Sequence, residues 1–325
     1  MATSNANGKS STTEFLRHAD PSTGASRSAS RSHAAPSRQS APRVEPTTPL
    51  GFPLRMLMPA MLCGLGTSGA KMVQRIIAIL ESQLGRLPTA CNYLLVDGAS
   101  PDLAVDPRHF LALDLAGCGT NPHRGRQRFY AEYQRIRYAL DQHLRTIDQF
   151  DPEVRVDNSP RDFLAVWIFA GCGGSSAGLL HPTITLAHDV ARQQRIRQVR
   201  VFLVLMGADM PLRDSSHSVL LEQKLIVPDN CANNLIKVFA DMASAAEISE
   251  PRPDGTVFTM PAADRVWAVS LVDQSNGFHE WSTTEELVEM VAWDYFLQIF
   301  TEVGKYLEDR NEDHERTGVV ARGTL

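Results

Sequence analysis

Cysteine is scarce in this chain, and the spacing of the cysteines argues against both a disulfide framework and a zinc site. The 325 residues include five cysteines, an odd number at wide and irregular intervals, and neither a Cys-x-x-Cys pair nor a His-Glu-x-x-His motif occurs. Disulfide frameworks and zinc sites show closer, more regular spacing of their cysteines and histidines. We therefore expect no disulfide scaffold and no metal site, and cysteine usage favours a reducing, cytoplasmic compartment.

Long hydrophobic runs are also missing. Every apolar run is far shorter than the ~18–20 residues that a membrane-spanning helix needs. The first residues lack the apolar core segment of a secretory signal. The sequence thus predicts neither a membrane span nor a secretory leader.

Residues 1–50 contain almost no large aliphatic side chains and are dominated by Ser, Ala, Thr, Pro and Arg. Such a stretch cannot bury enough apolar surface to offset the entropy cost of ordering, so we expect a disordered tail. It holds six basic and three acidic residues. We interpret the tail as a solvated linker, with contact to an unknown protein partner as the alternative.

The rest of the chain is acidic. The formal net charge of the whole chain is −5, and removing the +3 of the tail leaves −8 for residues 51–325. Nucleic-acid binding normally requires a basic surface, because backbone phosphates must be neutralised. We therefore expect no nucleic-acid binding by the folded part.

Short apolar runs alternate with amphipathic stretches from residue 54 onward. This alternation predicts an α/β fold with a Rossmann-like, mostly parallel sheet and helices on both faces. The folded domain is expected over 51–308, followed by a charged, frayed C-terminus over 309–325. The predicted strands are Met56–Cys63, Tyr93–Asp97, Phe110–Ala116, Phe163–Ala170, Val199–Met206 and Arg265–Val272.

Helices are predicted where apolar residues recur at helical spacing. One follows residue 69, and a second, longer one covers 129–147. A third is expected to begin near Gly178, with Pro182 in its first turn, where a missing N–H does little harm. The closing helix is expected to start near Ser282, with Glu285 in a capping box.

Three glycine-rich loops, each at the end of a hydrophobic run, lie in the first 180 residues. Glycine lets main-chain N–H groups crowd a phosphate without a Cβ in the way, so three such loops suggest convergence on one anionic ligand. A nucleotide is the leading ligand. The loops are Gly64-Leu65-Gly66-Thr67-Ser68-Gly69, Gly117-Cys118-Gly119-Thr120-Asn121-Pro122 and Gly171-Cys172-Gly173-Gly174-Ser175-Ser176-Ala177-Gly178.

Taken alone, the first loop fits a dinucleotide-binding oxidoreductase. Gly64–Gly69 satisfies Gly-x-Gly-x-x-Gly between a strand and a helix, and Asp97 ends the next strand, where a ribose-binding acid belongs. Asp97 could instead cap a turn with Gly98. A Walker A element is excluded, because Lys71 comes one place late and Met72 follows it instead of Ser or Thr.

The third loop, taken alone, fits an α/β-hydrolase. Gly174–Gly178 is a formal Gly-x-Ser-x-Gly with Ser176 as the nucleophile, and Asp209 and His279 follow in the expected order. However, Gly171–Gly173 separate the strand from the elbow, which should be a sharp turn. The hydrolase alternative also leaves the second loop without a role.

The second loop decides between these alternatives. Residues 117–125, Gly-Cys-Gly-Thr-Asn-Pro-His-Arg-Gly, resemble the Gly-Ala-Gly-Gly-Asn-Pro-x-x-Gly loop of the tubulin/FtsZ GTPase superfamily. Gly64–Gly69 then resembles the first phosphate loop of FtsZ, and Gly173–Gly178 resembles the tubulin signature Gly-Gly-Thr-Gly-Thr/Ser-Gly, with a counterpart for Pro182. Cys231–Lys237 resembles the start of the central helix. The resemblance spans about residues 55–300 and is greatest to bacterial tubulin-like proteins.

This resemblance implies roles for the loops. It also implies that the ligand is GTP or GDP, bound with or without Mg²⁺. Backbone N–H groups of 64–69 and 173–178 would cradle the α- and β-phosphates, and Ser175 would replace the signature threonine. Asn233 would bind the guanine edge, and Arg126 would reach the ribose or base. Gly119, Thr120 and Asn121 would approach the γ-phosphate. With Asp97 included, the candidate nucleotide-binding residues are Gly64, Gly66, Thr67, Ser68, Gly69, Asp97, Gly117, Gly119, Thr120, Asn121, Arg126, Gly173, Gly174, Ser175, Ser176, Gly178 and Asn233.

The chain departs from the superfamily pattern at several positions. Ser176 stands where the signature has glycine, and His123 replaces a glutamate. No Asn-x-Asp-x-x-Asp pattern follows residue 240, so Asp241, Asp254 and Asp264 are scattered candidates for the acids that would complete a neighbouring subunit's site. Two interpretations stay open, a GTPase that acts on self-association and a nucleotide-bound scaffold.

Overall fold

The structure, a computed structural model, describes residues 51–321 with several gaps. The residues not described within these limits are 52, 99–105, 116–117, 208–221, 223–226, 245–246, 253, 270–271, 274–278, 281–282 and 306–318. The predicted tail over 1–50 therefore lies outside the described residues, as do Gly117, Asp209 and Ser282. All elements belong to Val44–Leu325, which forms a single unit.

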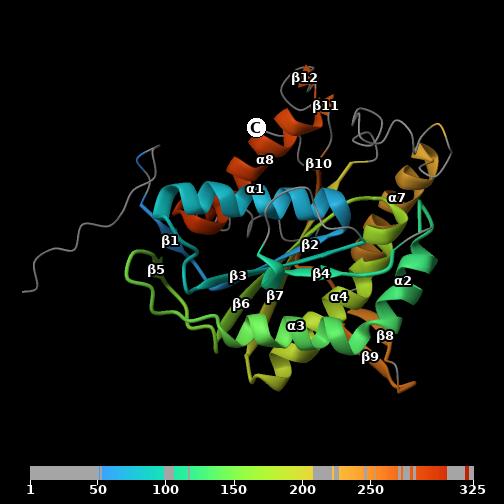
Figure 1. Cartoon of the computed structure of the whole chain (residues 1–325). Coiled ribbons are helices and arrows are strands. Elements are labelled where there is room, and N and C mark those ends of the chain that lie inside the picture. Colours follow the sequence, from blue (N-terminus) through green and yellow to red (C-terminus); the bar gives the residue numbers. More distant parts are fainter. Residues whose placement is uncertain are drawn as a thin grey trace, which may run out of the picture. The chain divides into compact units, whose positions relative to one another are not determined.

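A seven-stranded sheet forms the centre of this unit, and all neighbouring strands in it run parallel. Its inner strands are buried on both faces, which explains why they are continuous apolar runs. The predicted α/β fold with a parallel sheet is thus confirmed (Figure 1). In spatial order the strands are β13 (Val319–Ala321), β10 (Arg265–Val269), β7 (Gln198–Met206), β6 (Phe163–Ala170), β2 (Ala60–Leu65), β3 (Cys91–Asp97) and β4 (Phe110–Ala112).

The order of the strands reverses between β2 and β6. Strands β3 and β4 follow on one side of β2, whereas β6, β7 and β10 extend the sheet on the other side. Ala60–Leu65 pairs in register with Ala165–Ala170, so β2 and β6 end at the same level. In open parallel sheets, ligands bind outside the carboxyl ends of the strands at such a reversal.

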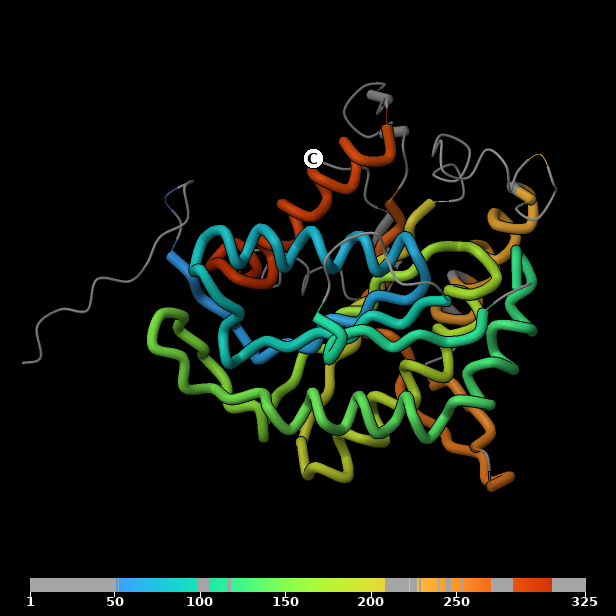
Figure 2. Tube along the Cα trace, in the orientation of Figure 1, coloured from blue at the N-terminus to red at the C-terminus, as the bar shows by residue number. Residues whose placement is uncertain are grey.

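Helices cover both faces of the sheet, as the sequence predicted (Figure 1). Helices α1 (Gly66–Leu84) and α8 (Thr284–Phe300) share one core with Leu62 of β2, whereas Met61 and Cys63 of the same strand point into the opposite core. Figure 2 shows α8 beside α1, although the two are far apart in sequence. In the described part of the chain, no helix is long and apolar enough to cross a bilayer. The opposite core is bordered by α2 (Pro122–Ala131), α3 (Tyr133–Arg145), α4 (Gly174–Gln193) and α7 (Pro228–Ser244).

Short elements complete the unit. A 3-10 turn, η1 (Pro107–His109), precedes β4. Among the described residues, three two-stranded pairs lie outside the main sheet, one parallel and two antiparallel. They are β1 (Arg55–Met56) with β5 (Arg155–Val156), β8 (Glu247–Pro251) with β9 (Val257–Pro261), and β11 (Val272–Asp273) with β12 (His279–Glu280).

Several predicted boundaries were wrong. The strand predicted over 56–63 is two strands, β1 and β2, with Pro59 between them. Proline has no N–H to give to a ladder, so a break there is expected. Phe110 starts a strand of three residues only, and β10 ends at Val269.

The helices differ from prediction in three places. The predicted helix over 129–147 is the pair α2 and α3, which meet at Glu132. Helix α4 begins at Gly174 rather than near Gly178, so Pro182 lies inside the helix and not in its first turn. Helix α8 is capped by Thr283, whose hydroxyl accepts from the N–H of Glu286, one residue later than the capping box predicted.

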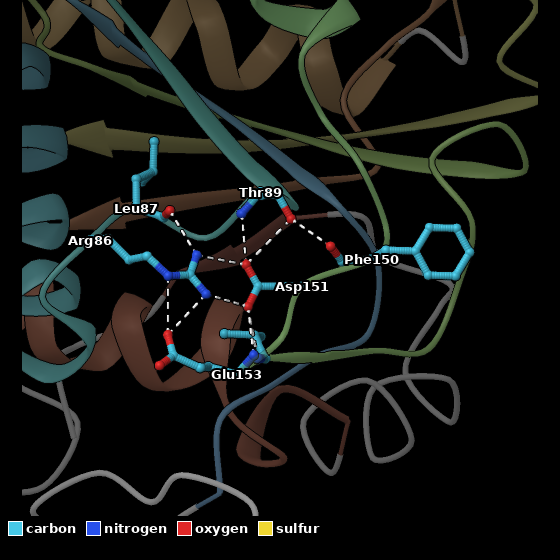
Figure 3. A network of polar contacts seen from close by, with 7 residues as sticks. Arg86, Leu87, Thr89, Phe150, Asp151 and Glu153 are labelled. Carbon is cyan, nitrogen blue, oxygen red and sulfur yellow. Dashed lines mark hydrogen bonds and ion pairs between the residues drawn. The ribbon is translucent and has the colours of Figure 1, made fainter.

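A buried carboxylate ties together two loops next to the start of β3. Both oxygens of Asp151 accept from Arg86, at 2.8 and 2.9 Å, and backbone N–H groups of Thr89, Glu153 and Val154 complete its contacts (Figure 3). The ring of Phe150 points away from this network and is 76% exposed. The network therefore holds the segment before β3 against the segment that follows α3.

Candidate functional site

Helix α1 starts at the end of β2 with no intervening loop. Gly64 and Leu65 belong to the strand, and Gly66 is the first residue of the helix. The N-cap residue Leu65 makes no side-chain cap, and the first turn contains no acidic residue. Because the first N–H groups of a helix have no intrahelical acceptor, this end carries the positive pole of the helix dipole toward the edge of the sheet.

Helix α4 repeats this arrangement at the end of β6. Gly171–Gly173 follow the strand, and Gly173 is an N-cap without a side chain. The first turn of α4 again lacks an acidic residue. Two uncapped helix N-termini therefore lie next to each other where the strand order reverses. Each of them favours the binding of an anion.

The first and third loops are in direct contact. Gly66 has a φ of +68°, and a Cβ there would lie 2.2 Å from the hydroxyl oxygen of Ser176. Ser176 is 6% exposed, so its side chain fills the space that the missing Cβ leaves. Only glycine meets both conditions at position 66.

The second loop packs on the third. The N–H of Gly174 donates to the carbonyl of Gly119 at 2.8 Å, and a Cβ on Gly174 would lie 2.3 Å from the nitrogen of Asn121. The side chain of Asn121 caps α2 by accepting from the N–H of His123 at 3.0 Å. The structure thus brings the three loops together, apart from Gly117, which lies outside the described residues.

Helix α7 contacts the loops through Asn234, a residue to which the sequence motifs assign no role. The amide nitrogen of Asn234 donates to the carbonyls of Thr120, at 3.1 Å, and Cys172, at 3.0 Å. Asn230 donates to the hydroxyl of Thr120 at 3.2 Å. The neighbouring Asn233, to which the resemblance assigns the base contact, is exposed. The motif selects Asn233, and no pattern in the sequence indicates the loop contacts of Asn234.

Asp97 joins β3 to the first turn of α1. Its carboxylate accepts from the hydroxyl of Thr67 at 2.8 Å and from the N–H of Gly98 at 2.7 Å. Burial raises the pKa of Asp97, and these two hydrogen bonds offset only part of the effect. The hydrogen bond from Gly98 matches the alternative to ribose binding, in which Asp97 caps a turn with Gly98.

A cavity of about 130 Å³ lies next to the loops, between α2, α4 and α7. Arg126 on its wall is held by Glu250, at 2.9 Å, and by the ring of His181, at 3.0 Å. Burial, reinforced by the charge of Arg126, lowers the pKa of His181. Small-molecule pockets usually run to about 300–1,000 Å³, so this cavity would hold only part of a nucleotide.

The hydroxyl groups of the third loop are already engaged in packing. Ser176 is the third residue of α4, so it does not stand at the apex of a sharp strand-to-helix turn. Ser175 hydrogen-bonds the thiol of Cys118. Asp209 and the side chain of His279 lie outside what the structure describes. The geometry that is described does not support Ser176 as a nucleophile.

The acidic residues and cysteines form no metal centre in the described part of the chain. Asp264 accepts from the N–H of Val201, and Asp254 accepts from the N–H of Thr256 in the β8–β9 turn. Asp241 lies on the wall of the small cavity. All five cysteines are among the described residues, and each is buried and outside any disulfide.

Comparison with solved structures gives a distant likeness. No family model matches the sequence, and no curated protein matches it either. A solved structure of CetZ from Methanosaeta thermophila strain DSM 6194 matches with a TM-score of 0.44 and 13% identity. The match covers 74% of this chain and 54% of the CetZ chain, so the chain spans little more than half of that protein. The fold assignment rests on the strand order and pairing given above.

Proposed function

We propose that this chain binds a guanine nucleotide at the carboxyl edge of its sheet, with the phosphates between the N-termini of α1 and α4. The observation that carries the proposal is the pairing of these two helix starts. Both lack a side-chain cap and an acidic first turn. Helix α1 follows β2 and helix α4 follows β6, the two strands between which the strand order reverses. Each N-terminus carries the equivalent of about half a positive charge.

The guanine base is inferred from sequence motifs. Residues 117–125 resemble the Asn-Pro loop of the tubulin/FtsZ superfamily, and 231–237 resemble its base-binding helix. In support, the second loop lies against the third, and α7 contacts both through Asn234. Motifs that resemble separate parts of one nucleotide site are therefore neighbours in space.

Within this proposal, a nucleotide-bound scaffold is better supported than a GTPase that acts on self-association. Two of the three candidate acids for hydrolysis already accept backbone hydrogen bonds. Asp254 accepts from the N–H of Thr256 in a turn, and Asp264 accepts from the N–H of Val201 in β7. The two alternatives differ in turnover. Phosphate release that rises with protein concentration would indicate the GTPase, and its absence at every concentration would indicate the scaffold.

The first test identifies the nucleotide that co-purifies with the full-length chain. Acid release followed by chromatography is expected to yield GTP or GDP, and added GTP should displace a fluorescent guanine nucleotide where ATP does not. NADH in the eluate, or no nucleotide together with no binding of added GTP, would overturn the proposal. An NADH result would instead support the oxidoreductase alternative.

A charge introduced at one end of α1 tests where the phosphates bind. Ser68 lies in the first turn of α1 and Ser82 in its last. Ser68→Asp should keep the fold, because a negative charge stabilises a helix N-terminus, yet it should weaken GTP binding at least about tenfold by repelling phosphate. Ser82→Asp is the matched control and should leave GTP affinity unchanged. Equal affinities of the two variants would contradict the placement.

A further inference from the structure

Four arginines lie together at the amino ends of β6 and β7, at the edge of the sheet opposite the glycine-rich segments. Arg192 is in the last turn of α4, Arg195 follows that helix, Arg197 directly precedes β7, and Arg161 comes two residues before β6. Strands β6 and β7 pair in parallel from their first residues. The N–H of Arg197 also donates to the carbonyl of Arg161 at 2.9 Å, so the two segments are adjacent. These four residues form the arginine cluster.

The charge of the arginine cluster is mostly unbalanced. All four residues are exposed. Arg197 is paired with Asp162 at 3.1 Å. The side chains of Arg161, Arg192 and Arg195 have no ion pair and no hydrogen bond among the described residues. The cluster therefore presents three unpaired guanidinium groups to solvent.

The acidic residue on the neighbouring helix does not neutralise the cluster. Asp141 of α3 accepts from the side chain of Gln194, next to Arg195, at 3.0 Å. Its carboxylate is already paired with Arg145 at 2.8 Å. The cluster is thus a local excess of positive charge on a unit whose formal net charge over 51–325 is −8.

Arg195 has a backbone conformation that normally requires glycine. Its φ is +62°, and it is the only described residue other than glycine with a positive φ. It directly follows the C-cap of α4, where the N–H of Ile196 donates to the carbonyl of Ala191 at 3.0 Å and closes the helix end. Glycine is usual at this position, because a Cβ is strained in the left-handed region. The helix dipole favours a cation near this end but not at the strained position, so the arginine there indicates a role for its side chain.

The surroundings of the cluster restrict its partner to a short acidic peptide. A nucleic acid would carry its phosphates beyond the cluster and over the acidic remainder of the unit. An anionic membrane is disfavoured, because none of the highly exposed large apolar side chains in the described part of the chain belongs to the segments of the cluster. Carboxylates suit arginine, whose planar guanidinium group can bind both oxygens at once.

We propose that the arginine cluster docks a short acidic segment of a partner protein, whose Asp or Glu side chains pair with Arg161, Arg192 and Arg195. The cluster lies at the amino edge of the sheet and the glycine-rich segments at its carboxyl edge. This docking is therefore independent of nucleotide binding.

Binding of a fluorescent hexaglutamate peptide to the full-length protein tests the proposal. Fluorescence anisotropy is expected to show saturable binding at low ionic strength and a marked loss of affinity in about 0.15 M salt, where exposed charges are screened. Hexaglutamine should not bind. Absence of saturable hexaglutamate binding would overturn the proposal. Tighter binding of a thymidylate oligonucleotide of the same length, or of phosphatidylserine vesicles, would also overturn it in favour of a nucleic acid or a membrane.

Two double variants with the same loss of charge locate the site. Arg192→Gln/Arg195→Gln should weaken hexaglutamate binding at least about tenfold, because two of the three unpaired guanidinium groups are lost. Arg128→Gln/Lys305→Gln removes the same charge outside the cluster and should change the affinity by less than about twofold. Equal losses in the two double variants, or undiminished binding in Arg192→Gln/Arg195→Gln, would refute the site.

A glycine at position 195 separates binding from stability. Arg195→Gly should raise the melting temperature, because glycine adopts the left-handed conformation without strain, and it should still weaken hexaglutamate binding several-fold. An arginine with a purely structural role would give no loss of affinity. Unchanged hexaglutamate affinity in Arg195→Gly would therefore exclude Arg195 from the docking surface.

Discussion

At the scale of single residues, two adjacent asparagines on α7 have different environments. Asn233 is exposed, whereas the amide of Asn234 bridges the carbonyls of Thr120 and Cys172. The base contact assigned to Asn233 by resemblance stays a prediction. Asn234 instead holds the second and third loops against α7, a role that depends on chain segments distant in sequence.

This difference predicts unequal effects of two alanine substitutions. Asn234→Ala should lower the free energy of unfolding by about 1–2 kcal/mol, because the partly buried hydrogen bonds to the carbonyls of Thr120 and Cys172 are both lost. Asn233→Ala should change it by less than about 0.5 kcal/mol, as is usual for surface positions. Urea denaturation measures both values. Similar losses in the two variants would show that Asn234 has no special structural role.

The Asp151 network predicts a dependence of stability on pH. Burial alone would raise the pKa of Asp151, but hydrogen bonds from Arg86 and from three backbone N–H groups outweigh it and hold this pKa well below its usual range. The folded pKa is therefore lower than the unfolded value of about 3.9. The contribution to stability is complete above about pH 4 and is lost as the pH falls toward the folded pKa.

Replacing this carboxylate tests the argument. Asp151→Asn should cost roughly 2–3 kcal/mol at neutral pH, since a buried partner of Arg86 is removed, and it should flatten the decline in stability below pH 4. Asp148→Asn, on the same connection, is the control and should retain the decline. The measurement is the free energy of unfolding between about pH 2 and 7. A decline in Asp151→Asn as steep as in the natural chain would exclude this network as its source.

At the scale of elements, the important feature is that helices start immediately at strand ends. The motif Gly64–Gly69 was predicted as a loop, but it is the last part of β2 and the first turn of α1. The third loop likewise includes the first turn of α4. Glycine suits both a loop and a close approach of helices and strands, so the sequence could not distinguish the two.

Gly66 and Gly85 allow crowding to be separated from backbone strain. Their φ angles are nearly equal, +68° and +71°, but a Cβ at Gly85 would have no atom within 4 Å, whereas one at Gly66 would meet Ser176. Gly85→Ala should therefore cost about 1 kcal/mol from strain alone, and Gly66→Ala at least about 1 kcal/mol more from overpacking. Thermal or urea unfolding gives both values.

A double variant provides the control for this prediction. Removing the hydroxyl in Gly66→Ala/Ser176→Ala should restore part of the stability lost in Gly66→Ala, because the nearest clashing atom is gone. Purely additive effects of the two substitutions would mean that Ser176 does not fill the space beside Gly66.

At the scale of the whole molecule, the candidate site joins elements from both cores. Helix α1 packs in one core and α4 in the other, and their N-termini meet at the edge of the shared sheet. A ligand bound there would contact helices from both cores. We therefore expect binding to stabilise the folded unit as a whole.

Ligand linkage makes this expectation quantitative. GTP at about 100 times its dissociation constant should raise the free energy of unfolding by about 2.7 kcal/mol, provided that it binds only the folded state. ATP and NADH at the same concentration should give much smaller increases. Differential scanning calorimetry or urea unfolding with each nucleotide is the measurement. A larger increase with NADH than with GTP would favour the oxidoreductase alternative.

The fold class and the positions of the glycine-rich segments follow from local sequence patterns alone. Runs such as 163–170 are apolar because inner parallel strands are buried on both faces, and this local pattern can be read without a structure. The folded chain was needed to show which strands are neighbours, that α1 and α4 start side by side, and that Asn234 contacts the second and third loops. These features depend on contacts between residues far apart in the chain, and local periodicity carries no record of such contacts.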